Sequence, residues 1–167
     1  RFVCEEHYGL FRAPPVQLVC PPNLMFMYMP SHLNHMIFEL MKNSLRAVVE
    51  RYGVEREDHY PPIKVIVVEG KEDITIKISD EGGGIPRSEV PLVWTYTYTT
   101  AQPDDLDPDF QTSDFLAPMA GFGYGLPLAR LYARYFGGDL KLISMEGYGT
   151  DVYLHLNRLS SSSEPLP

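Results

Sequence analysis

The sequence predicts an α+β fold, a two-layer α/β sandwich with a mixed sheet and its helices on one face. Two observations predict it. The strand-like runs come mostly in pairs joined by short turns, which indicates antiparallel hairpins, and few helical patterns remain to cover the sheet. A doubly wound sheet fits less well, because so many of the strands are joined by hairpins.

The first strand and the first long helix are predicted in the N-terminal third. Residues 16–20 (VQLVC) form a short apolar run between two Pro-Pro pairs and are typical of a strand. Pro30 and Ser31 mark a helix start, with Ser31 as the candidate N-cap, and the helical pattern runs to about Arg51 before Gly53 stops it. Apolar residues at helical spacing predict the side that packs on the sheet: Leu33, Met36, Ile37, Leu40, Met41, Ala47 and Val48.

Two hairpins supply the other strands. Residues 63–68 (IKVIVV) and 74–79 (ITIKIS) are strand-like runs separated by EGKED, and residues 140–145 and 150–156 form a second pair. The run at 74–79 alternates strictly between apolar and polar residues. We therefore expect its three isoleucines to face the core: Ile74, Ile76 and Ile78.

The segments between the hairpins are rich in turn residues. A short helix is predicted from Pro86, and a longer one begins after Gly125 and ends at the Gly-Gly pair 137–138. Residues 95–120 have neither strand nor helix period, and irregular segments of this length are usually functional, so we expect a lid over a site. We expect one domain over residues 1–159 and a flexible tail over 160–167.

Composition excludes several classes of protein. The 167 residues carry a formal net charge of -8 with scattered Lys and Arg, which argues against a nucleic-acid-binding surface. No apolar run is long enough for a membrane span, and no targeting peptide is evident. Cys4 and Cys20 are expected to be free thiols in a reducing compartment. Because the sequence does not begin with Met, we expect it to start inside a longer protein.

The first long helix carries a polar stripe at spacings of three and four residues. Its members are His35, Glu39, Lys42, Asn43 and Arg46. A carboxylate can accept a proton or orient a hydroxyl, an amide oxygen can bind Mg²⁺, and Lys or Arg can hold phosphate oxygens. A solvated helix face would give the same pattern, so the stripe alone decides nothing.

Two glycine clusters follow strands or precede helices where ligands often bind. Asp80 stands at the end of a strand before Gly82-Gly83-Gly84, where it can accept a hydrogen bond from an exocyclic amine such as that of adenine; an ordinary Asp turn is the alternative. Residues 121–125 (GFGYG) open onto a helix, so free backbone N–H groups and the helix dipole could hold a polyphosphate. Neither a Walker A loop nor a dinucleotide fingerprint is present.

Four motifs in order carry a family resemblance. ELMKNSLRA at residues 39–47 resembles the N box of GHKL ATPases, DEGGG at 80–84 and GFGYG at 121–125 resemble their two glycine boxes, and GTD at 149–151 resembles their terminal Gly-Thr element. Within that superfamily, the sequence is most similar to the mitochondrial pyruvate dehydrogenase kinases and their branched-chain relatives. The similarity lies in the segments PSHLNHMIFELMKNSLRA, ISDEGGGIP, TYTYTTA, GFGYGLPLARLYARYFGGDLKL and MEGYGTD. The resemblance implies a Bergerat-type ATP-binding fold.

The resemblance also implies roles for single residues. Glu39 matches the general base, with His35 one turn earlier to orient it, and Asn43 matches the Mg²⁺ ligand. Asp80 matches the adenine-binding aspartate, supported through water by Thr150. The other implied ATP contacts are Lys42, Arg46, Gly82, Gly84, Thr99, Thr100, Gly121, Phe122, Gly123, Tyr124, Gly125 and Leu126.

The implied activity is that of a mitochondrial matrix serine kinase. It would transfer the γ-phosphoryl group of ATP, with Mg²⁺ and with the family's K⁺, to the E1 α subunit of pyruvate dehydrogenase and so inactivate it. HRD and DFG elements are absent, so the chain is not built like the common protein kinases. The family's N-terminal helical bundle, which docks the lipoyl domain of the E2 subunit, is expected outside this chain. Trp94 is the only Trp, so the C-terminal Asp-Trp pair used in the family's homodimer contacts does not occur.

Three other functions remain open at this point. A branched-chain 2-oxoacid dehydrogenase kinase would have nearly the same ATP site. A bacterial-type histidine kinase would carry its phosphoacceptor on an upstream helix. An ATP-gated clamp or chaperone module would close on nucleotide and dimerise, although His35, Glu39 and the sequence after Gly121 speak against it.

Overall fold

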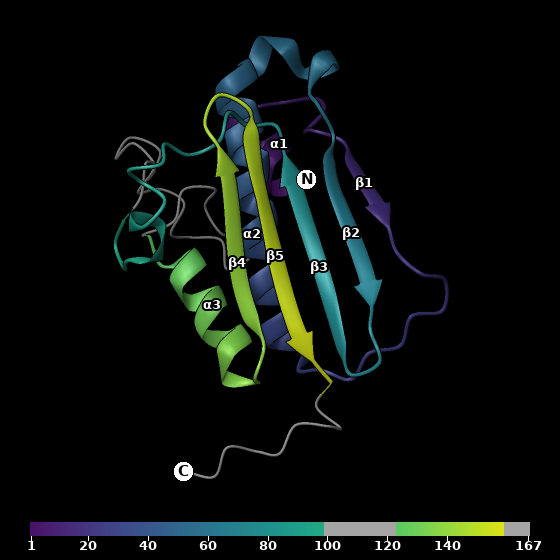
Figure 1. The fold of residues 1–167 in the computed structure, drawn as a ribbon. Helices are drawn as coiled ribbons and strands as arrows, with labels where there is room; N and C mark the ends of the chain where they lie inside the picture. The colour runs from purple at the N-terminus through teal and green to yellow at the C-terminus, as the bar shows by residue number, and fades with distance from the viewer. Residues whose placement is uncertain (99–122, 159–167) are drawn as a thin grey trace, which may run out of the picture.

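A computed structural model describes residues 1–98 and 123–158. The described part is a sheet with helices on one side (Figure 1). In chain order its elements are α1 (Phe2–Tyr8), β1 (Val16–Val19), α2 (Pro30–Tyr52), η1 (Val54–His59), β2 (Ile63–Glu69), β3 (Asp73–Asp80), η2 (Leu92–Trp94), α3 (Gly125–Tyr135), β4 (Asp139–Met145) and β5 (Gly149–Asn157).

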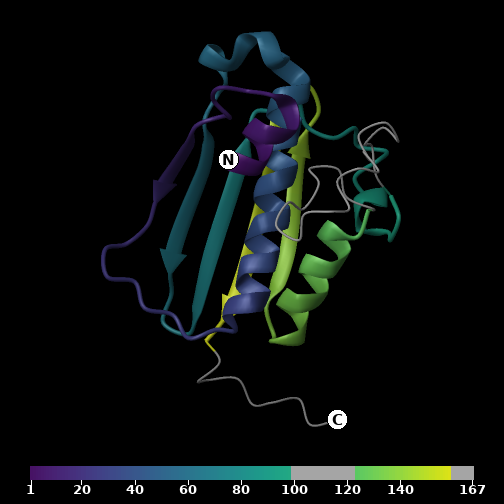
Figure 2. The same cartoon turned by 180° about the vertical axis from the view of Figure 1, so that it is seen from behind.

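The five strands form one mixed sheet in the order β1-β2-β3-β5-β4. β1 runs parallel to β2, and the other neighbours are antiparallel. The last residue of β3, Asp80, is paired with Thr150 near the start of β5. Viewed from behind, α1, α2 and α3 all lie on the same face of the sheet (Figure 2). The predicted two-layer α/β sandwich is confirmed.

The core lies between that face of the sheet and α2. Ile74, Ile76 and Ile78 are all buried, as their alternation predicted, and Leu154 and Leu140 continue the same surface on the neighbouring strands. From the helix side, α2 contributes four fully buried side chains: Met36, Leu40, Val48 and Val49. No helix in the described ranges is long and apolar enough to cross a membrane.

The N-cap of α2 lies two residues before the predicted one. Met29 is the N-cap with extended backbone, Pro30 is the first helical residue, and Ser31 lies inside the first turn without a capping role. The prediction of Ser31 as N-cap was therefore wrong. Pro30 decides the boundary, because its fixed φ suits the first helical position and its missing N–H needs no partner there. Gly53 ends the helix with a φ of 79°, as expected.

The predicted helix from Pro86 does not form. Residues 87–91 make a turn, followed by the short 3-10 helix η2. Pro91 prevents a longer helix, because it lacks an N–H and disfavours helical backbone at Val90. The helix α1 was not predicted. Both cysteines are free, and burial raises the pKa of Cys4 to about 11.

The hairpins and α3 agree with the sequence to within one or two residues. Of the expected lid at 95–120, only residues 95–98 belong to the described part, and the expected tail at 160–167 lies outside it. Both therefore stay predictions.

Candidate functional site

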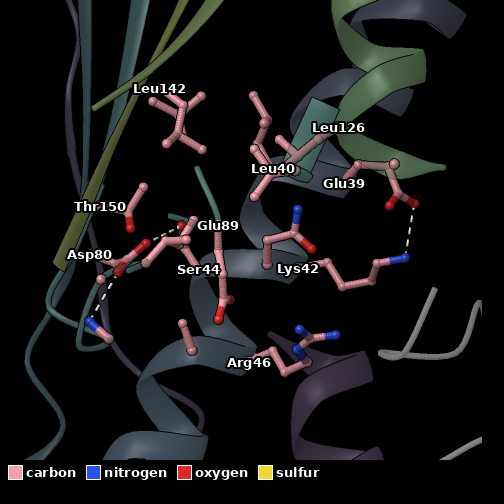
Figure 3. Close-up of a pocket in the computed structure, with 18 of the residues that line it drawn as sticks. Glu39, Leu40, Lys42, Ser44, Arg46, Asp80, Glu89, Leu126, Leu142 and Thr150 are labelled. Carbon is pink, nitrogen blue, oxygen red and sulfur yellow. Dashed lines mark hydrogen bonds and ion pairs between the residues drawn. The ribbon is translucent and has the colours of Figure 1, made fainter. Parts of the chain in front are cut away.

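A cavity of about 460 Å³ opens between the helical layer and one end of the sheet. This volume is within the range of roughly 300–1,000 Å³ typical of small-molecule sites. Its walls come from α2, the turn after β3, strands β4 and β5 and the start of α3, so segments far apart in sequence meet here (Figure 3). The predicted site residues that line it are Glu39, Lys42, Asn43, Arg46, Asp80, Gly82, Gly84, Gly123, Gly125, Leu126 and Thr150.

The polar stripe of α2 is not a solvated face. Lys42 is only 7% exposed, and the Glu39 side chain is 14% exposed. Both residues line the cavity, because α2 and α3 lie side by side on the sheet and this stripe of α2 faces the space beside α3. A buried Lys is uncommon unless it is paired, so the stripe is a built polar wall.

At one end of the cavity, which we call the Asp80 end, a buried carboxylate is held by protein donors. The Ser44 hydroxyl donates to Oδ2 of Asp80 over 2.9 Å, and the Gly82 amide donates to Oδ1 over 3.0 Å (Figure 3). Burial raises the pKa of Asp80 above its usual range, although these two hydrogen bonds act in the opposite direction. A carboxylate oxygen can accept more than one hydrogen bond, so Asp80 can also accept one from a ligand N–H group.

Thr150 faces Asp80 across the β3–β5 pair and is 9% exposed. Its hydroxyl is 2.9 Å from that of Ser144 on β4. The Ser144 hydroxyl in turn accepts a hydrogen bond from the Ile85 amide over 2.7 Å. These contacts join the strand ends to the turn after β3, and they fix the hydroxyls beside the carboxylate.

The glycines of the first cluster are needed for close approach. A Cβ at Gly82 would clash with the backbone and Cβ of Ala47 on α2. Gly84 has a φ of 70°, and a Cβ there would clash with the Met145 carbonyl. The turn therefore passes tightly between the helix and the β4–β5 turn, which brings backbone groups to the cavity.

At the opposite end, the Glu39 end, two opposite charges are paired. Nζ of Lys42 lies 3.0 Å from Oε1 of Glu39 (Figure 3). Arg46, one turn later, lines the same wall and pairs with Glu50 over 3.2 Å. Two carboxylates and two cations thus line this wall of the cavity, and they suit a ligand that carries phosphate charge and exchanges a proton.

The start of α3 completes the Glu39 end. Gly123 has a φ of 76°, and α3 begins at Gly125. A Cβ on Gly125 would meet the Glu39 carboxylate, so glycine leaves the room that this side chain occupies. The first N–H groups of a helix lack intrahelical partners and favour anions. The helix start therefore offers donors to a phosphate group.

The comparisons with known proteins agree with this geometry. Residues 29–160 match the family described as histidine kinase-, DNA gyrase B-, and HSP90-like ATPases. The chain belongs to this ATPase family. The resemblance inferred from the four motifs is confirmed, and ATP is the ligand that the family uses.

Curated relatives of this ATPase domain carry a more specific name. The chain is 64% identical, over 99% of its length, to the mitochondrial [pyruvate dehydrogenase (acetyl-transferring)] kinase of Schizosaccharomyces pombe. The enzyme of that name from Arabidopsis thaliana is 56% identical over 100% of the chain, and kinase isozyme 3 of Homo sapiens is 49% identical over 100%. The chain spans only 39%, 45% and 41% of these three relatives.

His35 and Tyr124 of the ATPase domain do not line the cavity. The His35 ring packs edge-on against Tyr132 of α3, with the ring centroids 5.5 Å apart, and its buried Nε2 has no hydrogen-bond partner among the described residues. Glu39 pairs with Lys42 instead of His35. Tyr124 is 46% exposed at the start of α3. Four further predicted contacts lie outside the described residues: Thr99, Thr100, Gly121 and Phe122.

Some residues at the site were not singled out from the sequence. Ser44 and Arg51 of α2 line the cavity, as do Glu89 and Tyr98, whose side chains are joined by a 2.8 Å hydrogen bond. Ser44 carried a usable signal, because a hydroxyl on the buried side of a helix requires a partner. Nothing local in the sequence marks the other three, since their roles depend on contacts between distant segments.

Proposed function

We propose that this chain is the ATP-binding catalytic domain of a mitochondrial matrix protein serine kinase. The kinase transfers the γ-phosphoryl group of ATP to a serine of the E1 α subunit of pyruvate dehydrogenase and thereby inactivates the complex. The observation that carries the proposal is a single cavity with a buried carboxylate, Asp80, at one end and a Glu39–Lys42 pair at the other. The chain that forms this cavity is 64% identical to the pyruvate dehydrogenase kinase of Schizosaccharomyces pombe.

We place the adenine at the Asp80 end. Its exocyclic amine would donate to the Asp80 carboxylate, which lines the cavity beside Thr150. Guanine would present a carbonyl oxygen at this point. Because the carbonyl and the Asp80 carboxylate are both acceptors, no hydrogen bond could form between them, and adenine is favoured. Leu142 and Val152 supply apolar wall for the ring.

The triphosphate would extend to the Glu39 end. The N-terminus of α3, Lys42 and Arg46 are the donors there, and all are directed into the cavity. Glu39 would accept the proton of the substrate hydroxyl or orient it, while Lys42 holds the carboxylate in place. We retain His35 as a residue that orients Glu39 in the working enzyme, supported only by its place one turn before Glu39 on α2.

Asn43 is the residue we propose as the protein ligand of Mg²⁺. It lines the cavity, and no group of three or more His, Cys, Asp or Glu side chains within residues 1–98 and 123–158 could hold a metal. A single amide oxygen from Asn43 fits Mg²⁺, because this ion commonly keeps several waters and takes its other ligands from substrate phosphates. When bound, Mg²⁺ neutralises charge on the phosphates during transfer.

The organisation of the full protein follows from the same proposal. Residues 1–159 would form the catalytic domain, with a lid at 95–120 and a tail at 160–167. The lipoyl domain of the E2 subunit would bind a helical bundle outside this chain. A homodimer is also proposed, and sedimentation of the full-length protein tests it.

Phosphosite mapping tests the central claim. Full-length protein is incubated with ATP, Mg²⁺ and purified E1 from the pyruvate and branched-chain complexes in parallel, and phosphopeptides are identified by mass spectrometry. We expect phosphoserine on the pyruvate E1 α subunit only. Labelling of the branched-chain E1 alone would reassign the substrate, and acid-labile phosphohistidine or nucleotide-driven dimerisation without transfer would reject the proposal. Repeating the assay in K⁺ and in Na⁺ tests the K⁺ expected from the resemblance.

A further inference from the structure

Arg51, in the last turn of α2, binds two turns that are distant in sequence. Its Nη1 donates to the Glu81 carbonyl over 2.9 Å and also to the Tyr148 carbonyl. Its Nη2 donates to the Gly147 carbonyl over 2.9 Å. One guanidinium thus joins α2 to the turn after β3 and to the turn between β4 and β5. Arg51 also lines the cavity.

The two turns also contact each other, and the Ile85 amide ties the turn after β3 to Ser144. Two backbone hydrogen bonds connect them, from Gly83 N to Tyr148 O over 3.1 Å and from Gly147 N to Gly83 O over 2.7 Å. Gly83 and Gly147 have φ values of 94° and 81°, which glycine adopts readily but does not favour over other conformations. Glycine loses more backbone freedom than other residues on ordering, so a side chain that fixes both turns has a large local effect.

The contact with Glu81 reaches Asp80 through one peptide group. The Glu81 carbonyl and the Gly82 N–H belong to the same planar unit, so the orientation of one sets that of the other. Arg51 holds the carbonyl side of this unit, and Oδ1 of Asp80 accepts the hydrogen bond from its N–H side over 3.0 Å. Rotation of the peptide would remove that donor from Asp80.

We propose that Arg51 is a positioning residue for the nucleotide base. It holds the 81–82 peptide and the β4–β5 turn, and it thereby keeps the Asp80 carboxylate in the orientation that accepts the adenine amine. Arg51 does not bind the base itself. The inference rests on the proposed function only in taking an adenine nucleotide as the ligand of the cavity.

The first test measures the turns without any ligand. Hydrogen exchange is followed by mass spectrometry in full-length wild type, Arg51→Met, Arg51→Lys and the control Arg56→Met. Arg56 suits as a control, because it is exposed in η1 and its side chain has no partner among the described residues. We expect faster exchange of amides 82–84 and 147–149 in Arg51→Met, and a smaller increase in Arg51→Lys, whose ammonium cannot reproduce the planar fork. Because Arg51 is exposed, the melting temperature should change little.

The second test measures affinity for adenosine and for ADP by calorimetry. Loss of the fixed carboxylate should weaken both ligands in Arg51→Met by about the same factor, roughly tenfold. In the kinase assay, KM for ATP should rise while kcat is retained, and Arg51→Lys should recover part of the affinity. Arg56→Met should match wild type.

Each outcome decides a separate claim. Unchanged exchange in Arg51→Met would show that Arg51 does not hold the turns, and faster exchange with unchanged adenosine affinity would show that the turns do not position Asp80. A loss for ADP but not adenosine would indicate direct phosphate binding, which also overturns the proposal. If wild type bound neither ligand, the proposed function would be wrong, while the exchange result would still decide whether Arg51 holds the two turns.

Discussion

The hydroxyl of Ser44 donates a hydrogen bond to Oδ2 of Asp80 over 2.9 Å, which ties α2 to the end of β3. Both residues are buried, at 3% and 7% exposure. The Gly82 amide occupies the other carboxylate oxygen. Asp80 is therefore fixed in position before any ligand arrives, and an adenine amine would bind a preorganised acceptor.

Replacement of Asp80 should remove nucleotide binding. In Asp80→Asn the side chain keeps its shape but loses the charged acceptor, and an unpaired buried polar group costs about 1–3 kcal/mol. That cost raises Kd for ADP by roughly 5- to 150-fold, and Asp80→Ala should abolish measurable binding. Calorimetry on the full-length protein gives Kd, and circular dichroism verifies the fold. Unchanged affinity in both variants would exclude Asp80 from the base contact.

The raised pKa of Asp80 predicts opposite pH effects on binding and on folding. Since the carboxylate is the acceptor, affinity for adenosine should fall as the pH drops through the raised pKa, above the ordinary value of 3.8. In the same window the folded state binds the proton more tightly than the unfolded state, so the contribution of Asp80 to the free energy of unfolding should increase.

Adenosine is used for this measurement because it has no phosphate to titrate. Calorimetry between pH 4 and 8 gives the affinity, and urea unfolding over the same range gives stability. The Asp80→Asn variant is the reference for both series. If the difference in unfolding free energy between wild type and Asp80→Asn were flat with pH, or sloped the other way, the pKa of Asp80 would not be raised.

Glu39→Gln should separate binding from chemistry. Glutamine retains the size of the side chain but cannot act as a base, so ATP affinity should stay within a few fold while phosphoryl transfer slows by ~10²-fold or more. Single-turnover transfer to E1 measures the chemical step. Glu55→Gln is a matched control, because Glu55 is exposed in η1 and away from the cavity. Transfer at the wild-type rate in Glu39→Gln would remove Glu39 from the mechanism.

Gly125→Ala tests the close approach of α3 to the Glu39 carboxylate. The new Cβ would take the place of Oε2, the movable end of a side chain, and Gly125 does not have a positive φ. Because the side-chain end that the new Cβ meets can move and alanine is compatible with the first helical position, the fold should not be weakened. We expect kcat to fall while the melting temperature stays the same or rises. Leu131→Ala, on the exposed side of α3, is the control; equal kcat in Gly125→Ala and wild type would show that Glu39 does not need its observed position.

The sequence was informative where a local pattern has one physical outcome. Alternation predicted the buried isoleucines of β3, and glycine marked the end of α2. Eleven of the residues that line the cavity were also predicted as site residues, because the four motifs and their order were recognisable without any coordinates. Prediction failed at Ser31 and at the Pro86 segment, where two start or stop signals competed within a few residues.

Long-range contacts could not be predicted in the same way. The polar stripe of α2 could equally have been a solvated face, and only the structure shows that Lys42 is buried where α3 packs beside α2. The place of His35 against Tyr132 depends on where α3 lies. The link from Arg51 to Glu81 and Tyr148 spans 30 and 97 residues, which no local pattern records.

The sequence by itself thus determined the fold class, the order of the elements and a little under half of the residues that line the cavity, because periodicity, turn residues and motifs are local properties of the chain. Only the tertiary structure decided which of those side chains are buried, which are paired and which turn is held by which helix. Those outcomes depend on the approach of segments far apart in sequence, where burial sets the strength of each charge and hydrogen bond.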